Sequence, residues 1–119
     1  MAHSKIEYPS AVAYVAVFER DQDGFVVHFP DLKGCMSEGS NLEIATENTK
    51  DALIQYLSSL ADDRTPFPRA GYRLREGGDV QEIRIETDLS SLIEKSLMLE
   101  RGYSENDLKR ELLSEYVNK

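Results

Sequence analysis

Residues 11–29 decide the fold and read AVAYVAVF, then ERDQDG, then FVVHF. The first eight of these residues are all apolar, and their valines and aromatics favour a β-strand that is covered on both faces. The polar residues that follow end in Asp23-Gly24, a pair typical of the tight turn in a hairpin. The last segment is again mostly β-branched or aromatic. The stretch therefore predicts an antiparallel β-hairpin.

The connection after the hairpin predicts a turn and a short third strand. Pro30 cannot donate a hydrogen bond to a sheet, so the second strand should end there. Gly34 can take the positive φ that a tight turn requires, and residues 35–37 are long enough for a brief strand. Within this connection we expect Asp31 to accept hydrogen bonds from amides of the turn. We expect Cys35 to be a small buried apolar side chain.

A long amphipathic helix is predicted next. Ser40 and Asn41 are both suitable N-caps, and Ser40 is followed three residues later by Glu43, as in a capping box. From residue 42 to residue 60, apolar and small side chains recur at three- and four-residue steps and form one stripe along the helix. Pro66 then prevents the helix from continuing.

The second half of the chain predicts one further strand and two helices. Residues 82–87 alternate between polar and apolar side chains, which indicates a strand with one solvent-exposed face. A helix capped by Asp88 or Ser90 follows, and Gly102 can end it in a left-handed conformation. Ser104 can cap the last helix. The apolar stripe of that helix is Leu108, Leu112, Leu113, Tyr116 and Val117.

The predicted order is β-β-β-α-β followed by two helices, an α+β fold in which one helix packs on the sheet. With 119 residues the chain has the size of one domain. We divide it into a main domain at 1–87 and a C-terminal helical extension at 88–119. The extension is expected to be an αα-hairpin that packs on the sheet or forms a dimer. DNA binding is the alternative role for this extension.

The composition excludes several classes of function. The formal net charge is −8, and residues 1–63 carry four Lys and Arg against 11 Asp and Glu. This charge disfavours a simple basic nucleic-acid binder and suits a basic partner. The single cysteine excludes an internal disulfide and a Cys-based zinc site. The longest apolar run has eight residues, whereas a membrane span needs about 20, so we expect a soluble cytoplasmic protein without cofactors.

Several short motifs resemble those of one known family. They are AVFE at 16–19, DGFVV at 23–27, FPDLKGC at 29–35, and Gly39, Leu42, Glu43, Ala45 and Asn48 around the helix start. Together they resemble the HicB antitoxin family over residues 11–68, and FPDLKGC is the most specific of them. The strand at 82–87 stands where the fourth strand of that family would follow.

The resemblance implies a fold, a partner and a role. Proteins of the HicB family have a partial RNase H-like β-β-β-α-β fold and typically bind and block a small basic toxin, HicA, which cleaves mRNA. Many also carry a C-terminal DNA-binding module and repress their own operon. On this basis we expect an antitoxin that forms a homodimer or a higher homo-oligomer. The acidic residues that we expect at the toxin interface are Glu19, Asp21, Asp23, Asp31 and Glu38.

A stand-alone RNA- or DNA-binding regulator is the alternative function. The candidate nucleic-acid-binding residues are Arg64, Arg69, Arg73, Arg75, Lys109 and Arg110. The four arginines are interleaved with aromatics, as in proteins that bind single-stranded RNA, but a solvated loop with its arginines paired to acids is favoured. The last helix resembles that of a ribbon–helix–helix repressor, although the strand at 82–87 would turn two glutamates towards phosphates. That strand can complete the sheet or enter a DNA groove, but not both.

Catalysis is the least favoured function. An RNase H-like nuclease would cluster carboxylates around two magnesium ions. The available carboxylates are Glu19, Glu43, Glu47 and Asp88. The first strand has no carboxylate in its middle, and the two helix glutamates lie off the apolar stripe, so solvated acids are the better explanation. His28 has no carboxylate neighbour in sequence and is expected at the surface. We therefore predict no catalytic and no metal-binding residues.

Overall fold

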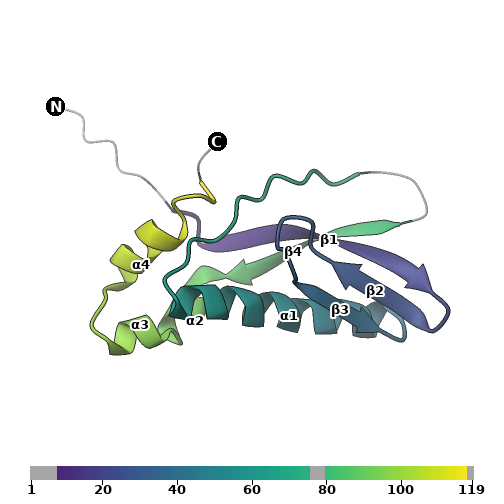
Figure 1. Ribbon diagram of the computed structural model, residues 1–119, viewed down its shortest axis with the longest axis horizontal. Coiled ribbons are helices and arrows are strands. Elements are labelled where there is room, and N and C mark those ends of the chain that lie inside the picture. Colours follow the sequence, from purple (N-terminus) through teal and green to yellow (C-terminus); the bar gives the residue numbers. More distant parts are fainter. Residues whose placement is uncertain (1–7, 76–79, 118–119) are drawn as a thin grey trace.

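The computed structural model describes residues 8–75 and 80–117 as one α+β fold (Figure 1). The strands are β1 (Ala11–Asp21), β2 (Gly24–His28), β3 (Met36–Gly39) and β4 (Gln81–Asp88). The helices are α1 (Leu42–Asp62), α2 (Leu89–Glu94), α3 (Leu97–Glu100) and α4 (Glu105–Leu112). The predicted α+β class and the β-β-β-α-β order are confirmed.

The four strands form one antiparallel sheet in the order β3-β2-β1-β4. The predicted hairpin is confirmed, because β1 and β2 pair in antiparallel fashion on either side of a tight turn. β3 begins at Met36, one residue later than predicted. β4 pairs with β1 from Gln81 to Asp88, along its whole length. The strand predicted at 82–87 therefore completes the sheet and does not stand apart from it.

Helix α1 covers one face of the sheet, and the main core lies between them (Figure 1). Asn41 caps the helix, because its side-chain oxygen accepts a hydrogen bond of 2.9 Å from the Ile44 amide. Side chains alternate along a strand, so every second residue of β1 points to the helix. The buried residues of α1 are Ala45, Thr49, Leu53, Leu57 and Ala61. The residues of β1 in the same core are Val12, Tyr14, Ala16 and Phe18.

An extended segment at residues 68–75, which we call the strap, crosses the opposite face of the sheet (Figure 1). The Tyr72 amide donates to both carboxylate oxygens of Asp31, at 2.9 and 3.2 Å. The Tyr72 hydroxyl donates to Glu82 at 2.6 Å. Asp31 follows β2 and Glu82 lies on β4, so Tyr72 spans β1, the strand between them. This crossing explains why the valines of β1 that point away from α1 are also buried.

The C-terminal extension contains three short helices where the sequence predicted two. The first expected helix breaks before Ser96. The buried Ser96 hydroxyl accepts a hydrogen bond from the Met98 amide at 3.2 Å, which starts a new helix at that point. Gly102 follows α3 with a φ of +95°, and Ser104 caps α4, both as predicted.

The three leucines of the apolar stripe predicted for the last helix pack inside the chain, whereas Val117 of that stripe is 39% exposed. Leu108, Leu112 and Leu113 are each 0% exposed and belong to the same buried cluster as β1 and α1. The Phe67 amide donates to the Leu112 carbonyl at 2.8 Å. The extension therefore packs on the rest of the fold, and these leucines are not free to form a dimer. The division into domains at residues 87 and 88 stays a prediction.

Candidate protein-interaction face

Three strands place two acids and a valine in one row on the sheet face opposite α1. Glu19 on β1 lies opposite Val26 on β2, which in turn lies opposite Glu38 on β3. Residues directly opposite each other in antiparallel strands point to the same face. The chain neighbours Phe18 and Val27 are buried in the core, so this row points away from the helix. All three side chains of the row are exposed.

Two more of the predicted acids lie at the end of the hairpin. Asp21 ends β1, and its side chain accepts a hydrogen bond of 2.9 Å from the amide of Asp23 in the turn. Together with Glu38 they line an open depression of ≈ 470 Å³, to which α1 contributes Ile44, a side chain that is 44% exposed. The structure thus brings together four of the five predicted acids. We call Glu19, Asp21, Asp23, Val26, Glu38 and Ile44 the acidic face.

Helix α1 holds β3, and therefore Glu38, in place. Gly39 lies so close to the helix that a Cβ atom there would be 2.3 Å from the Ala45 amide nitrogen. The Asn48 side chain donates a hydrogen bond of 2.9 Å to the Glu38 carbonyl oxygen. Gly39, Ala45 and Asn48 belong to the sequence motifs quoted above, and the structure gives them this packing role.

Exposed apolar side chains lie beside these acids, and the sequence-based prediction did not include them. Val26 is 37% exposed, and Met36, which lies opposite His28 in the next row, is 68% exposed. The signal that could have found them is strand alternation, because both residues alternate with residues that point to the core side of the sheet. His28, which we predicted at the surface, is half-buried. A protein interface needs such apolar contacts at its centre in addition to charges.

The fifth predicted acid, Asp31, is separate from the acidic face. It follows the end of β2 that is remote from the hairpin turn. The sequence predicted hydrogen bonds to amides of its own turn, whereas the structure bonds its carboxylate to the amide of Tyr72 in the strap. Asp31 therefore ties the strap to the sheet. Its place in a toxin interface stays a prediction.

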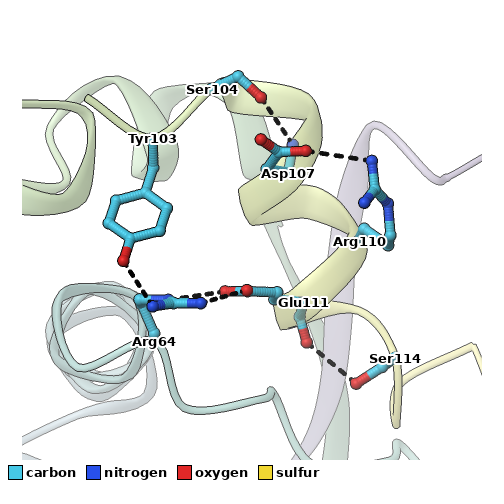
Figure 2. A network of polar contacts seen from close by, with 7 residues as sticks. All are labelled: Arg64, Tyr103, Ser104, Asp107, Arg110, Glu111 and Ser114. Atoms are coloured by element: carbon cyan, nitrogen blue, oxygen red, sulfur yellow. Dashed lines mark hydrogen bonds and ion pairs between the residues drawn. The ribbon is translucent and has the colours of Figure 1, made fainter. Parts of the chain in front are cut away.

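Among the basic candidates, Arg64 is engaged inside the chain. Figure 2 shows its guanidinium donating to both carboxylate oxygens of Glu111 and, at 2.6 Å, to the Tyr103 hydroxyl. The hydrogen bond between the two charged groups lowers the pKa of Glu111 and raises the pKa of Arg64. This network joins the end of α1 to the C-terminal helices, so the expectation that arginines of this segment pair with acids is confirmed for Arg64.

The remaining basic candidates divide between α4 and the strap. Lys109 and Arg110 form ion pairs of 3.5 and 3.1 Å with acids of their own helix. The strap carries Arg69, Arg73 and Arg75, all exposed. The guanidinium of Arg75 lies 5.8 Å from the centroid of the Tyr72 ring. Nucleic-acid binding by any of these residues stays a prediction.

Within residues 8–75 and 80–117, no group of three or more His, Cys, Asp or Glu side chains is arranged to hold a metal ion. Asp88, one of the acids considered for catalysis, accepts a hydrogen bond from the Ser91 hydroxyl at 2.7 Å. Cys35 is buried as predicted, and burial raises the pKa of its thiol to about 11, so the nucleophilic thiolate is scarce at neutral pH. None of the described helices is both long enough and apolar enough to cross a membrane.

Residues 14–95 match the sequence model of a family described as the HicB-like antitoxin of bacterial toxin–antitoxin systems. A UPF0150 protein of Helicobacter pylori is 42% identical over 52 residues, which are 44% of this chain and 72% of the relative. A UPF0150 protein of Thermoplasma acidophilum is 35% identical over 57 residues, which are 47% of this chain and 83% of the relative. The crystal structure of the antitoxin HicB3 is similar in fold, with a TM-score of 0.53 and 21% identity over 87% of this chain and 96% of that one.

Proposed function

Because the chain belongs to the HicB-like antitoxin family of bacterial toxin–antitoxin systems, we propose that it binds and neutralises a small basic toxin of the HicA kind. The acidic face is the observation that carries this proposal. Its row on the sheet sets Glu19 and Glu38 on either side of the exposed Val26, and its depression sets Asp21, Asp23 and Glu38 around the exposed Ile44. An interface of this composition can combine apolar contacts at its centre with charged contacts around them.

Charge supports a basic partner. The first half of the sequence, residues 1–63, contains the residues of the acidic face and has a net charge of −7 from four Lys and Arg against 11 Asp and Glu. A toxin that cleaves RNA needs cationic side chains to hold phosphates. The carboxylates of the acidic face would bind those same cations, so the toxin could not hold RNA and the antitoxin at once. Opposite charge would also speed the encounter of the two proteins.

Co-expression with a small basic protein encoded next to this chain tests the proposal. We expect a complex on size exclusion and relief of the growth arrest that the toxin causes. Reversal of three charges by Asp21→Lys, Asp23→Lys and Glu38→Lys should remove both effects. The matched control reverses three exposed acids elsewhere, Glu94→Lys, Glu100→Lys and Glu115→Lys.

The outcomes separate a specific face from general charge. If the acidic-face variant fails to bind and the control binds, the proposed face is supported, because both variants have the same net charge. If both bind, the acidic face is not the toxin interface. If neither this chain nor its variants bind any adjacent basic protein, the antitoxin proposal itself fails.

We propose this role for a regulator that has no catalytic activity of its own. Repression of its own operon would be a further part of it, through DNA contacts that the C-terminal helices would have to provide. Specific support for direct nucleic-acid binding comes from the exposed arginines of the strap, Arg69, Arg73 and Arg75, which lie around Tyr72 in the sequence. Salt-sensitive binding of RNA or operator DNA that is lost in Arg69→Ala/Arg73→Ala would establish the alternative.

A further inference from the structure

The strap and the acidic face lie on the same side of the sheet, opposite α1 (Figure 1). One row of side chains on this side crosses all four strands and consists of Met36, His28, Val17 and Glu82. It lies two residues along β1 from Glu19, a spacing of about 7 Å in a strand. Tyr72 of the strap covers the β4 end of this row, because its hydroxyl donates to Glu82. The strap is therefore a direct neighbour of the acidic face.

The strap covers buried valines but has almost no buried side chains of its own. Val15 and Val17, which point away from α1, are only 7% and 6% exposed. Between residues 69 and 75 every side chain is exposed except that of Tyr72, which is half-buried. Among the described residues, no backbone–backbone hydrogen bond ties this part of the strap to the sheet. A segment with so few buried contacts opens at a lower free-energy cost than the sheet beneath it.

Two carboxylates hold the strap on the sheet. The Tyr72 amide donates to Asp31, and both the Tyr72 hydroxyl and the Arg75 amide donate to Glu82 at 2.6 Å. At the start of the strap, the Tyr14 hydroxyl donates to the Pro68 carbonyl at 2.6 Å. Residues 69–75 can therefore lift from β1 by breaking a few side-chain hydrogen bonds, while the pairing of the strands stays intact.

The strap also carries the same sign of charge as the partner that the acidic face would bind. It contains Arg69, Arg73 and Arg75 and no acidic residue. While the strap is closed, these cations lie on the side of the sheet that carries the acidic face, where they repel a basic protein. The valines beneath are out of reach in that state. Lifting the strap would remove the cover and the positive charge from the same place.

We propose that the strap is a lid, and that the basic partner binds with the strap lifted, so that Val15 and Val17 extend the acidic face across β1. This inference rests on the proposed function, because the partner is the same basic toxin. The two valines would enlarge the apolar centre that Val26 begins, which is where interfaces gain most of their affinity. Because the partner binds only the open form, its apparent association constant is proportional to the open fraction.

Hydrogen exchange tests the lid without a partner. The amides of Tyr72 and Arg75 should exchange at least about 100-fold faster, relative to their intrinsic rates, than the paired amides of β1 and β4. Tyr72→Phe removes the hydrogen bond to Glu82 and should speed the exchange of both strap amides roughly tenfold, with the paired amides unchanged. The matched control is Tyr103→Phe, which removes a hydroxyl that bonds to Arg64 and should leave the strap amides as they are.

Affinity for the partner tests the docking surface, with the small basic protein encoded next to this chain as the probe. Tyr72→Phe should bind it roughly tenfold more tightly than the unmodified chain, the same factor by which the open fraction rises. Tyr103→Phe should bind it like the unmodified chain. In the complex, the amides of Tyr72 and Arg75 should exchange faster than in the free chain, while the paired amides of the sheet stay protected.

Three results would overturn the lid. They are strap amides that exchange no faster than the paired amides of the sheet, a Tyr72→Phe variant that binds the partner no more tightly, and strap amides that gain protection in the complex. If the partner binds but the strap does not open by itself, the proposed function stands and the lid is wrong. If the strap opens but no variant binds the partner, the proposed function fails and the docking role of the valines fails with it.

Discussion

Gly24 and Gly34 both have positive φ values, +146° and +84°, but their surroundings differ. A Cβ at Gly24 would lie 2.2 Å from the Gly39 carbonyl oxygen, whereas one at Gly34 would have no atom within 4 Å. We expect Gly34→Ala to cost about 1 kcal/mol through backbone strain, and Gly24→Ala to cost at least about 2–3 kcal/mol because the clash adds to the strain. Urea unfolding followed by circular dichroism measures both. Equal losses would mean that the contact with Gly39 relaxes without cost.

Arg64 occupies a position that helices usually give to glycine. Its amide donates to the Ala61 carbonyl and the Thr65 amide to the Leu60 carbonyl, the two bonds of a Schellman motif, and its φ is +54°. A non-glycine residue is strained there. The ion pair with Glu111 is an interaction that glycine could not make, and it offsets part of that strain.

Two substitutions separate the backbone and side-chain contributions of Arg64. Both Arg64→Ala and Arg64→Gly remove the ion pair, but only glycine relieves the strain. We expect the folding equilibrium constant of Arg64→Ala to be roughly tenfold below that of Arg64→Gly, with the unmodified chain between the two, because its arginine bears the same strain as alanine and its exposed ion pair contributes little. Chemical denaturation ranks the three proteins. If Arg64→Gly were no more stable than Arg64→Ala, the positive φ at this position would carry no backbone strain.

At the scale of elements, the features that depend on interactions between nearby residues were predicted correctly from the sequence. The hairpin around Gly24 and the caps at Asn41 and Ser104 follow from patterns within a few residues of one another. The break before Ser96 did not, because a serine in a periodic apolar stretch fits a helix equally well. Only burial of Ser96 among other elements makes its own side chain the best partner for a following amide.

The strap shows the same limit for contacts between distant segments. Residues 64–81 have no periodicity, and nothing in their pattern indicates that Tyr72 bonds to both Asp31 and Glu82. The candidate site divides in the same way. Its acids were predictable from charge and Val26 from strand alternation, but exposure of Ile44 depends on which part of the helix the rest of the chain leaves uncovered.

The Tyr72–Glu82 hydrogen bond predicts how the strap responds to pH. The bond lowers the pKa of Glu82 and raises that of Tyr72. Its contribution to stability is therefore complete above the ordinary pKa of glutamate, about 4.3, and below that of tyrosine, about 10. It is lost as the pH falls through the lowered pKa of Glu82 or rises through the raised pKa of Tyr72. Glu82→Gln should thus have a lower unfolding free energy than the unmodified chain at neutral pH.

The difference should shrink in acid, where Glu82 is protonated in both states of the unmodified chain. Denaturant titrations from about pH 7 to pH 3 provide the measurement. Glu94→Gln, an exposed substitution of the same kind on α2, is the control and should show no such trend. A Glu82→Gln effect that stays constant down to pH 3 would mean that the carboxylate charge does not hold the strap.

At the scale of the whole molecule, the C-terminal helices pack into the same hydrophobic core as the sheet. Their buried leucines share one cluster with the core residues of β1 and α1. The Tyr116 hydroxyl forms hydrogen bonds with both the amide and the carbonyl of Ala13, because β2 ends before it could pair with that residue. The Leu97 amide donates to Asp62 at the end of α1 at 3.0 Å. A sheet without these helices would leave apolar side chains and peptide groups of β1 uncovered.

Leu108 tests whether the chain unfolds as one unit. This side chain is 0% exposed, so Leu108→Ala should cost about 2–5 kcal/mol, while Leu97→Ala, at a position that is 46% exposed, should cost far less. If the extension shares its stability with the sheet, hydrogen exchange at the Tyr14 amide in β1 should lose as much protection as the global unfolding free energy does. If residues 88–119 unfolded separately, Leu108→Ala would expose the C-terminal amides and leave Tyr14 protected. Native-state exchange at low denaturant distinguishes the two cases, because the Tyr14 amide faces β4 and opens only when the sheet does.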